Sequence, residues 1–170
     1  LRQYEEEHGE LRNVYRDPRG FLIEPNGRIT PLGTQEVERY DFPAWEYNKI
    51  LFVEKKGFLP LFQDAKLAAK YDMAIVCSEG YATRAAKKLL ACAQDRDMRI
   101  GVMHDADADG YQIRAKLQEA ARFCRAVDVV DLGLHVEDAI ALGLEPETFT
   151  RTKNLPAELV DDLNAIEREH

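Results

Sequence analysis

The stretch from Met98 to Arg114, which reads MRIGVMHDADADGYQIR, constrains the fold of this chain more than any other. An apolar run leads directly into three aspartates separated by single alanines, Asp105, Asp107 and Asp109, and Gly110 follows them. An apolar run bounded by turn residues predicts a buried strand. In open α/β sheets, ligands bind at the carboxyl ends of the strands, where these aspartates fall.

The three aspartates predict a metal site. Carboxylates this close together repel one another unless a positive charge lies between them. Hard divalent cations such as Mg²⁺ take oxygen ligands of this kind, and Mn²⁺ is the expected substitute. A solvated acidic turn is the alternative interpretation of the same residues.

From Lys49 onwards, strand and helix patterns alternate. A four-stranded parallel, doubly wound α/β sheet is therefore expected, with the helices as crossover connections. Its strands are predicted at 50–53, 73–77, 98–103 and 127–130, and its helices at 58–71, 83–94 and 110–125.

The flanking segments suggest a division into three parts. Residues 1–48 are expected to form an N-terminal helix, a β-hairpin turning at Asn26-Gly27, and a connector. Residues 49–150 are the α/β domain, and residues 151–170 are a C-terminal helical tail. Because the chain opens on Leu1 rather than methionine, we expect it to be a fragment of a longer protein.

Composition narrows the class of protein. The net charge of −8 argues against a stand-alone nucleic-acid binder, whose affinity comes largely from Lys and Arg at phosphates. No apolar run is long enough to span a membrane. The cysteines, Cys77, Cys92 and Cys124, have no zinc or disulfide spacing, so we expect buried free thiols in a reducing cytoplasm.

A fourth acidic residue completes the expected site. Glu54 closes the first predicted strand of the α/β domain, and the aspartates close the third. This arrangement resembles the Toprim domain of topoisomerases, primases and some nucleases, which has a glutamate after its first strand and an Asp-x-Asp after its third.

Three motifs make the resemblance more specific. Residues 53–57, Val-Glu-Lys-Lys-Gly, are similar to the Val-Glu-Lys-Glu-Gly of topoisomerase VI A subunits and their meiotic double-strand-break relatives. Residues 80–84 match that family's Gly-Tyr and Ala-Thr-Arg, and residues 105–113 match its Asp-x-Asp-Pro-x-Gly-x-x-Ile. Two positions depart from the pattern, since Ala108 replaces the proline and Glu79 stands where a lysine is usual.

The resemblance implies roles for individual residues. Asp105 and Asp107 would hold Mg²⁺, Glu54 would be a third ligand or a general acid/base, and Asp109 could serve a second metal. Candidate DNA or phosphate contacts are Lys55, Gly80, Arg84 and Gly110. His104, next to Asp105, is expected to be a structural histidine.

The resemblance also implies a function. The expected activity is that of a Mg²⁺-binding domain in a topoisomerase VI A-like DNA cleavage protein, which supports phosphodiester transesterification. In that family a winged-helix domain with the nucleophilic tyrosine precedes this segment, so we expect the fragment alone to be inactive. Candidate partners are DNA, that upstream domain, a second copy of the chain and a separate ATPase subunit.

Two other hypotheses stay open. One is a metal-dependent Toprim nuclease that uses water as its nucleophile. The other is a DNA-docking or assembly module that binds metal but catalyses nothing.

Overall fold

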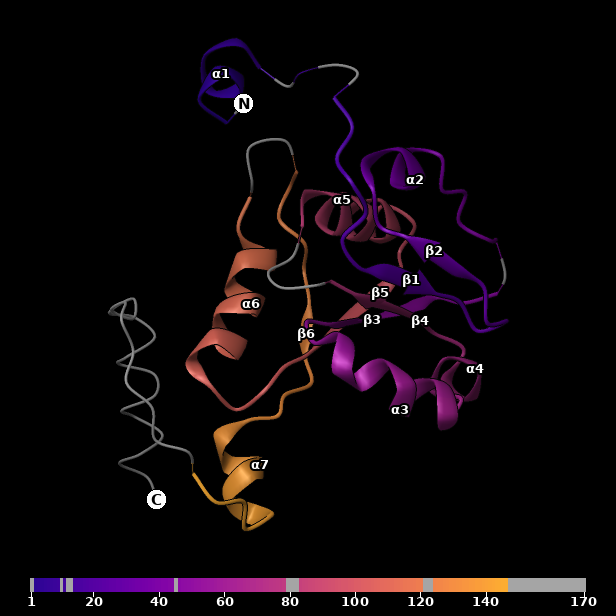
Figure 1. Ribbon diagram of the computed structural model, residues 1–170. Coiled ribbons are helices and arrows are strands. Elements are labelled where there is room, and N and C mark those ends of the chain that lie inside the picture. The colour runs from indigo at the N-terminus through magenta and orange to yellow at the C-terminus, as the bar shows by residue number, and fades with distance from the viewer. Residues whose placement is uncertain are drawn as a thin grey trace.

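The computed structural model describes residues 2–9, 11, 14–44, 46–78, 83–120 and 124–146. Its centre is a six-stranded sheet in the order β2-β1-β4-β3-β5-β6 (Figure 1). The strands are β1 (Phe21–Ile23), β2 (Ile29–Pro31), β3 (Lys49–Val53), β4 (Ala74–Cys77), β5 (Arg99–Met103) and β6 (Val130–Asp131).

Four of these strands run parallel, which confirms the α/β class. β3 pairs in parallel with both β4 and β5, and β5 pairs in parallel with β6. The N-terminal hairpin extends this same sheet, because β1 is antiparallel to both β2 and β4. Its turn lies at Asn26-Gly27, where Gly27 has a φ of 87° and Asn26 accepts a hydrogen bond from the Arg28 amide at 2.8 Å.

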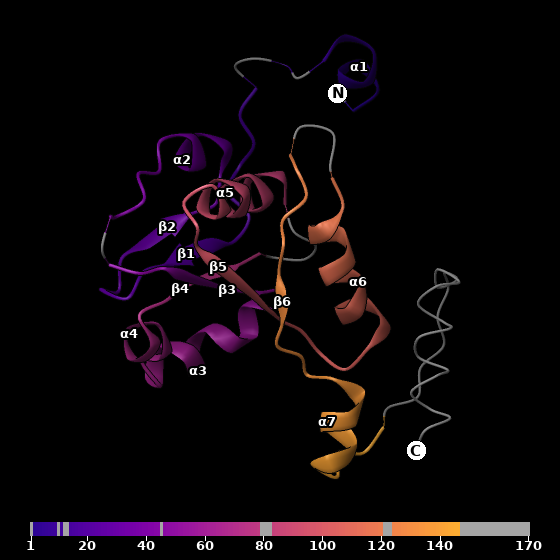
Figure 2. The same ribbon diagram turned by 180° about the vertical axis from the view of Figure 1, so that it is seen from behind.

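Helices cover both faces of the sheet (Figures 1 and 2). α2 and α5 lie on one face and α3 and α4 on the other, while α6, beside β6, packs into the same core as α5 through Ile113 and Leu117. The helical segments are α1 (Arg2–His8), α2 (Thr34–Glu38), the 3₁₀ turn η1 (Lys56–Phe58), α3 (Leu59–Asp64), α4 (Leu67–Tyr71), α5 (Arg84–Gln94), α6 (Ala108–Gln118) and α7 (Val136–Ala141).

Two apolar cores follow from the alternation of side chains along the central strands. Ile50 and Phe52 of β3 pack on the face that carries α5 and α6, with Leu89 and Ile113. Leu51 of β3 and its neighbours pack on the opposite face against α3 and α4. β3 is thus buried on both sides, as expected for the central strand of a doubly wound sheet.

The helix predicted at 58–71 is interrupted. Lys66, between α3 and α4, has a φ of 49°, in the left-handed region that ends a right-handed helix. The segment is therefore two short helices preceded by η1, rather than one continuous helix.

α6 is shorter than the predicted 110–125. It ends at Gln118 because Glu119 takes an extended conformation. The ammonium of the buried Lys87 donates hydrogen bonds to the carbonyl oxygens of Lys116 and Glu119. These carbonyl groups at the end of the helix therefore have hydrogen-bond partners. The strand predicted at 127–130 is also displaced, to Val130–Asp131.

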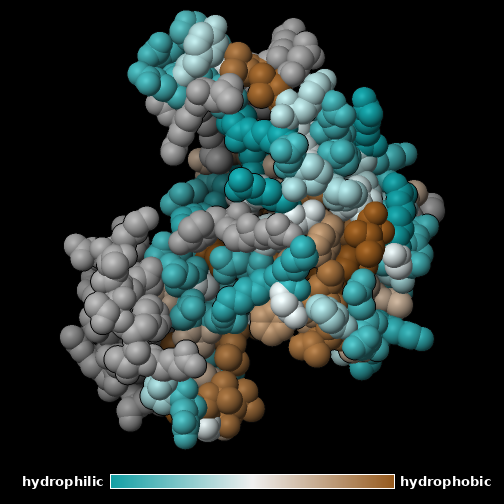
Figure 3. Space-filling view, viewed as in Figure 1, coloured by the Kyte–Doolittle hydropathy of each residue, from teal (hydrophilic) through white to brown (hydrophobic). Residues whose placement is uncertain are grey.

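Other predictions have mixed outcomes. Cys77, Cys92 and Cys124 form no disulfide, but Cys92 is only partly buried. The C-terminal tail at 151–170 lies outside the described residues. None of the described helices is long and apolar enough to cross a membrane. Figure 3 shows apolar side chains at the surface over α7, where Ile140 and Leu142 are exposed.

Candidate metal and phosphate site

Neighbouring parallel strands bring the predicted acidic residues to one edge of the sheet. Val53, the last residue of β3, is in register with Met103, the last residue of β5. Glu54 directly follows Val53, and His104 and Asp105 directly follow Met103. Glu54 and the His104-Asp105 pair therefore follow the carboxyl ends of two adjacent parallel strands.

Glu54 occupies an unfavourable electrostatic position. Its half-buried side chain has a raised pKa, principally because burial disfavours the charged form. The negative charges of Asp107 and Asp109 raise this pKa further, while Lys55 and Lys116 oppose the increase. Glu54 is thus within electrostatic range of two of the three aspartates, and a cation bound here would relieve the repulsion.

The three aspartates have different surroundings. Asp105 forms an ion pair with the ammonium of Lys55. Asp107 is the N-cap of α6, and its carboxylate accepts a hydrogen bond from the Gly110 amide at 2.7 Å. Asp109 lies in the first turn of α6, where the helix dipole favours a negative charge. The turn is therefore built into the start of a helix.

Gly110 is required by close packing. A Cβ atom at this position would lie 2.3 Å from the Asp105 carbonyl oxygen and 2.9 Å from Nδ1 of His104. Both distances are far below van der Waals contact. The clash by itself explains why a glycine follows the aspartates, so a phosphate contact is not needed to account for Gly110.

His104 holds the base of the acidic turn. Its side chain is buried, with Nδ1 2.7 Å from the Asp105 carbonyl oxygen and Nε2 3.1 Å from a carboxylate oxygen of Asp131. Asp131, at the end of β6, also accepts hydrogen bonds from Arg114 and from the Gly133 amide. His104 is thus the hydrogen-bonded structural histidine that the sequence predicted.

Sequence reasoning missed Asp131 and Lys116. Asp131 lies at the end of a two-residue strand that periodicity placed too early. Lys116 lies two helical turns beyond Asp109, and burial lowers its pKa while Asp109 and Glu54 act in the opposite direction. The seven-residue spacing of Asp109 and Lys116 puts them on one side of a helix, a signal that the sequence did contain.

A small cavity opens beside the acidic residues. It has a volume of about 310 Å³ and is lined by Glu54, Lys55 and Asp105 from the strand ends, and by Leu132 and Asp138 from the β6–α7 region. Among the described residues, no three His, Cys, Asp or Glu side chains are grouped closely enough to hold a metal ion as they stand. The donor types and the repulsion at Glu54 nevertheless fit a hard cation.

The candidate phosphate contacts are dispersed. Lys55 is engaged with Asp105, and Gly80 lies outside the described residues. Arg84 is at the start of α5, where Thr83 caps the helix by accepting a hydrogen bond from the Ala86 amide. The two terminal nitrogens of Arg84, Nη1 and Nη2, donate hydrogen bonds to the carboxylate of Glu5.

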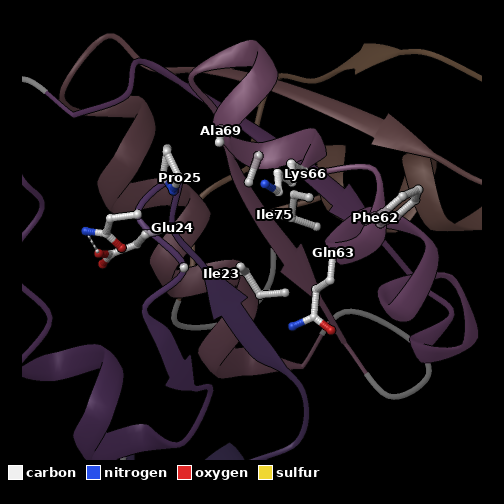
Figure 4. Close-up of a pocket in the computed structure, with 11 residues that line it drawn as sticks. Ile23, Glu24, Pro25, Phe62, Gln63, Lys66, Ala69 and Ile75 are labelled. Carbon is white, nitrogen blue, oxygen red and sulfur yellow. Dashed lines mark hydrogen bonds between the residues drawn. The ribbon is translucent and has the colours of Figure 1, made fainter.

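Another cavity lies at the opposite end of the sheet. It has a volume of about 370 Å³ and is lined by residues of the hairpin, α3, α4 and β4 (Figure 4). Glu24 lies at its wall, but the Tyr40 hydroxyl donates a 2.6 Å hydrogen bond to this carboxylate. Because the cavity is near the amino ends of the parallel strands, it is remote from the acidic edge.

Comparison with known proteins agrees with this geometry. Residues 49–167 match the family model described as the Toprim domain of the topoisomerase 6 A-subunit/Spo11 type. The matched span contains Glu54, Asp105, Asp107 and Asp109. The search of the curated proteins found no match.

Proposed function

Because this chain belongs to the Toprim family of Spo11 and the topoisomerase 6 A-subunit, we propose that it is the Mg²⁺-binding domain of a DNA cleavage protein. The observation that carries the proposal is the register of β3 with β5, which puts Glu54 and the aspartates just beyond the carboxyl ends of two adjacent parallel strands. Such a group of carboxylates is stable at neutral pH when a cation neutralises it.

Glu54, Asp105, Asp107 and Asp109 are the proposed ligands. A bound Mg²⁺ would neutralise phosphate charge and orient the scissile bond. The metal would have to compete with Lys55 for Asp105, since these two side chains are paired. The Lys55 ammonium would then be released to face the phosphate.

Glu54 has a second proposed role, as a proton carrier. Its raised pKa means that this carboxyl retains a proton at a higher pH than an exposed glutamate. It could therefore supply a proton to a leaving oxygen held at the sheet edge.

The remaining expectations belong to the same proposal. The nucleophilic tyrosine would come from an upstream winged-helix domain, and the proposed partners are a second copy of the chain and a separate ATPase subunit. Cysteines without disulfides suit the proposed reducing cytoplasm.

The proposal is tested with end-labelled plasmid fragments on denaturing gels. Residues 1–170 alone should bind duplex DNA weakly at physiological salt and cut it little, because the net charge is −8 and the nucleophilic tyrosine is proposed to lie in the upstream domain. The longest natural form of the protein should cut DNA only with Mg²⁺, and Glu54→Gln should abolish the cutting. Protein should remain attached to one DNA end until protease is added.

Other outcomes would favour the alternatives. Free ends without attached protein would indicate a nuclease that uses water. Metal-dependent DNA binding without any strand break in the longest form would indicate a docking module. Robust cutting by residues 1–170 alone would contradict the expected inactivity of this fragment.

A further inference from the structure

A polar cavity lies near the carboxyl edge, on the hairpin side of the sheet. It has a volume of about 800 Å³ and is lined by residues 15–19, which precede β1, and by the beginning of α5. Phe21, the first residue of β1, is in register with Cys77, the last residue of β4. The cavity is therefore near the same sheet edge as Glu54, which follows the strand beside β4.

Three arginines, Arg16, Arg19 and Arg84, line this cavity together with one carboxylate, Asp17. They stand out in a chain whose net charge is −8. The cavity also includes Thr83, the N-cap of α5, an eleven-residue helix whose dipole adds positive potential at this end. This arrangement is suited to an anion.

The structure shows a carboxylate held between two of these arginines. Glu5 of α1 is only 3% exposed, and its carboxylate accepts hydrogen bonds from Nη1 and Nη2 of Arg84, at 3.1 and 3.0 Å. Arg16 lies 3.5 Å from the same carboxylate. The two-pronged geometry is the one by which arginine holds both carboxylates and phosphates.

The pairing has an electrostatic consequence for Glu5. The Arg84 hydrogen bonds hold the pKa of this carboxyl below its usual value, with further lowering by the charge of Arg16. Glu5 is therefore an anion across the neutral pH range, like a phosphodiester. Along the chain, residues 9–20 connect the helix that carries it to β1.

We infer that Arg16, Arg19 and Arg84 form a binding site for a phosphodiester group of DNA, and that Glu5 occupies this site as an internal phosphate mimic. This inference rests on the proposed function, because it takes DNA to be the substrate held at the acidic edge. A DNA strand that reaches this cavity displaces α1, so Glu5 weakens DNA binding until displacement occurs.

The first test is DNA binding by matched charge variants of the full 170-residue chain, measured by anisotropy with a short labelled duplex at several salt concentrations. Glu5→Gln should tighten binding about tenfold, because it removes the competing hydrogen-bonded charge. Glu7→Gln is the control, since it makes the same charge change on α1 at an exposed side chain. Equal effects of the two variants would overturn the inference.

The arginines are tested in the same assay. Arg16→Gln and Arg84→Gln should weaken binding and each reduce the salt slope by about one, as expected when one phosphate contact is lost. Lys70→Gln, on α4, should change neither quantity. Arg84→Lys keeps the charge and serves as the check that any loss is not due to misfolding.

Hydrogen exchange of the α1 amides gives a second readout that does not depend on affinity. DNA should accelerate exchange in α1 of the wild-type chain, whereas inorganic phosphate at equal phosphate concentration should not. Acceleration by inorganic phosphate alone would assign the site to free phosphate and overturn the DNA assignment.

The two proposals fail in different ways. DNA binding that depends on Glu54 and Asp105 but is indifferent to Glu5, Arg16 and Arg84 would contradict only this inference. Absence of DNA binding by every variant, even at low salt, would contradict the proposed function together with it.

Discussion

Lys55 and Asp105 form an ion pair across the carboxyl ends of β3 and β5, although fifty residues separate them in the sequence. The lysine ammonium thus neutralises one of the carboxylates proposed to bind metal. The side chains are 55% and 33% exposed, so the pair is accessible to solvent and can exchange for a cation.

Lys55→Met should therefore strengthen Mg²⁺ binding. The substitution removes a competing cation from Asp105, and an exposed ion pair of this kind corresponds to about a two- to fivefold change in Kd. Titration calorimetry measures the change. Lys49→Met, at the other end of β3, is the control and should leave Kd unaltered.

Metal binding should raise the melting temperature of the folded protein. At a Mg²⁺ concentration one hundred times Kd, binding to the folded state alone adds about 2.7 kcal/mol, which corresponds to a rise of roughly 5–10 °C in Tm. The Asp105→Asn/Asp107→Asn variant should lose this rise. Because asparagine is also a good N-cap, the substitution at 107 removes charge while retaining the start of α6.

A scanning-calorimetry series with and without Mg²⁺ provides the measurement. An unchanged response in the double variant would place the ion elsewhere in the molecule. Mn²⁺ should reproduce the effect of Mg²⁺.

The pKa of Glu54 predicts a pH dependence of stability. Burial raises this pKa above the ordinary 4.5, so the folded state holds the proton more tightly than the unfolded chain does. As the pH rises above 4.5, this carboxyl ionises in the unfolded chain before it ionises in the folded state. The free energy of unfolding therefore decreases with rising pH. Glu54→Gln should thus stabilise the metal-free protein at pH 7.

The stabilisation should disappear in acid. Below the unfolded pKa both states are protonated, and Glu54→Gln and the wild type should unfold at similar urea concentrations. Glu145→Gln, at an exposed position, is the control and should show no such trend. A gain that persists unchanged into acid would exclude the electrostatic explanation.

The sequence predicted the parts of this fold that depend on local pattern. The apolar runs of β3, β4 and β5 and the Asn26-Gly27 turn each carry their own signal, and each is found where predicted. Glu54 and Asp105 reach one edge because neighbouring parallel strands have their carboxyl ends on the same side of the sheet. The alternation of strand and helix patterns in the sequence is enough to predict this topology.

The missed features depend on contacts between distant segments. The end of α6 is satisfied by Lys87, which lies on α5 and gives no local sign of this role. The attachment of the hairpin to β4 and the seating of Glu5 against Arg84 likewise join residues that are far apart in sequence. Hydrophobic periodicity is a property of one segment of sequence, so it cannot predict which distant segments pair with each other.

The final prediction concerns Gly110 and separates its packing role from a role in phosphate binding. In Gly110→Ala the new methyl group would meet the Asp105 carbonyl oxygen at 2.3 Å, and this backbone atom cannot move without shifting the acidic turn. Overpacking of this kind costs about 1–3 kcal/mol. The variant should therefore unfold at lower urea concentration and show a smaller Mg²⁺-induced rise in Tm.

Gly57→Ala is the matched control for this experiment. Gly57 lies in the turn after β3, and an added Cβ would meet nothing within 4 Å. This variant should keep wild-type stability and the full metal response, because alanine adds no clash there. If Gly110→Ala kept wild-type stability and metal response but lost DNA binding, glycine would be needed for approach of the DNA backbone rather than for packing against Asp105.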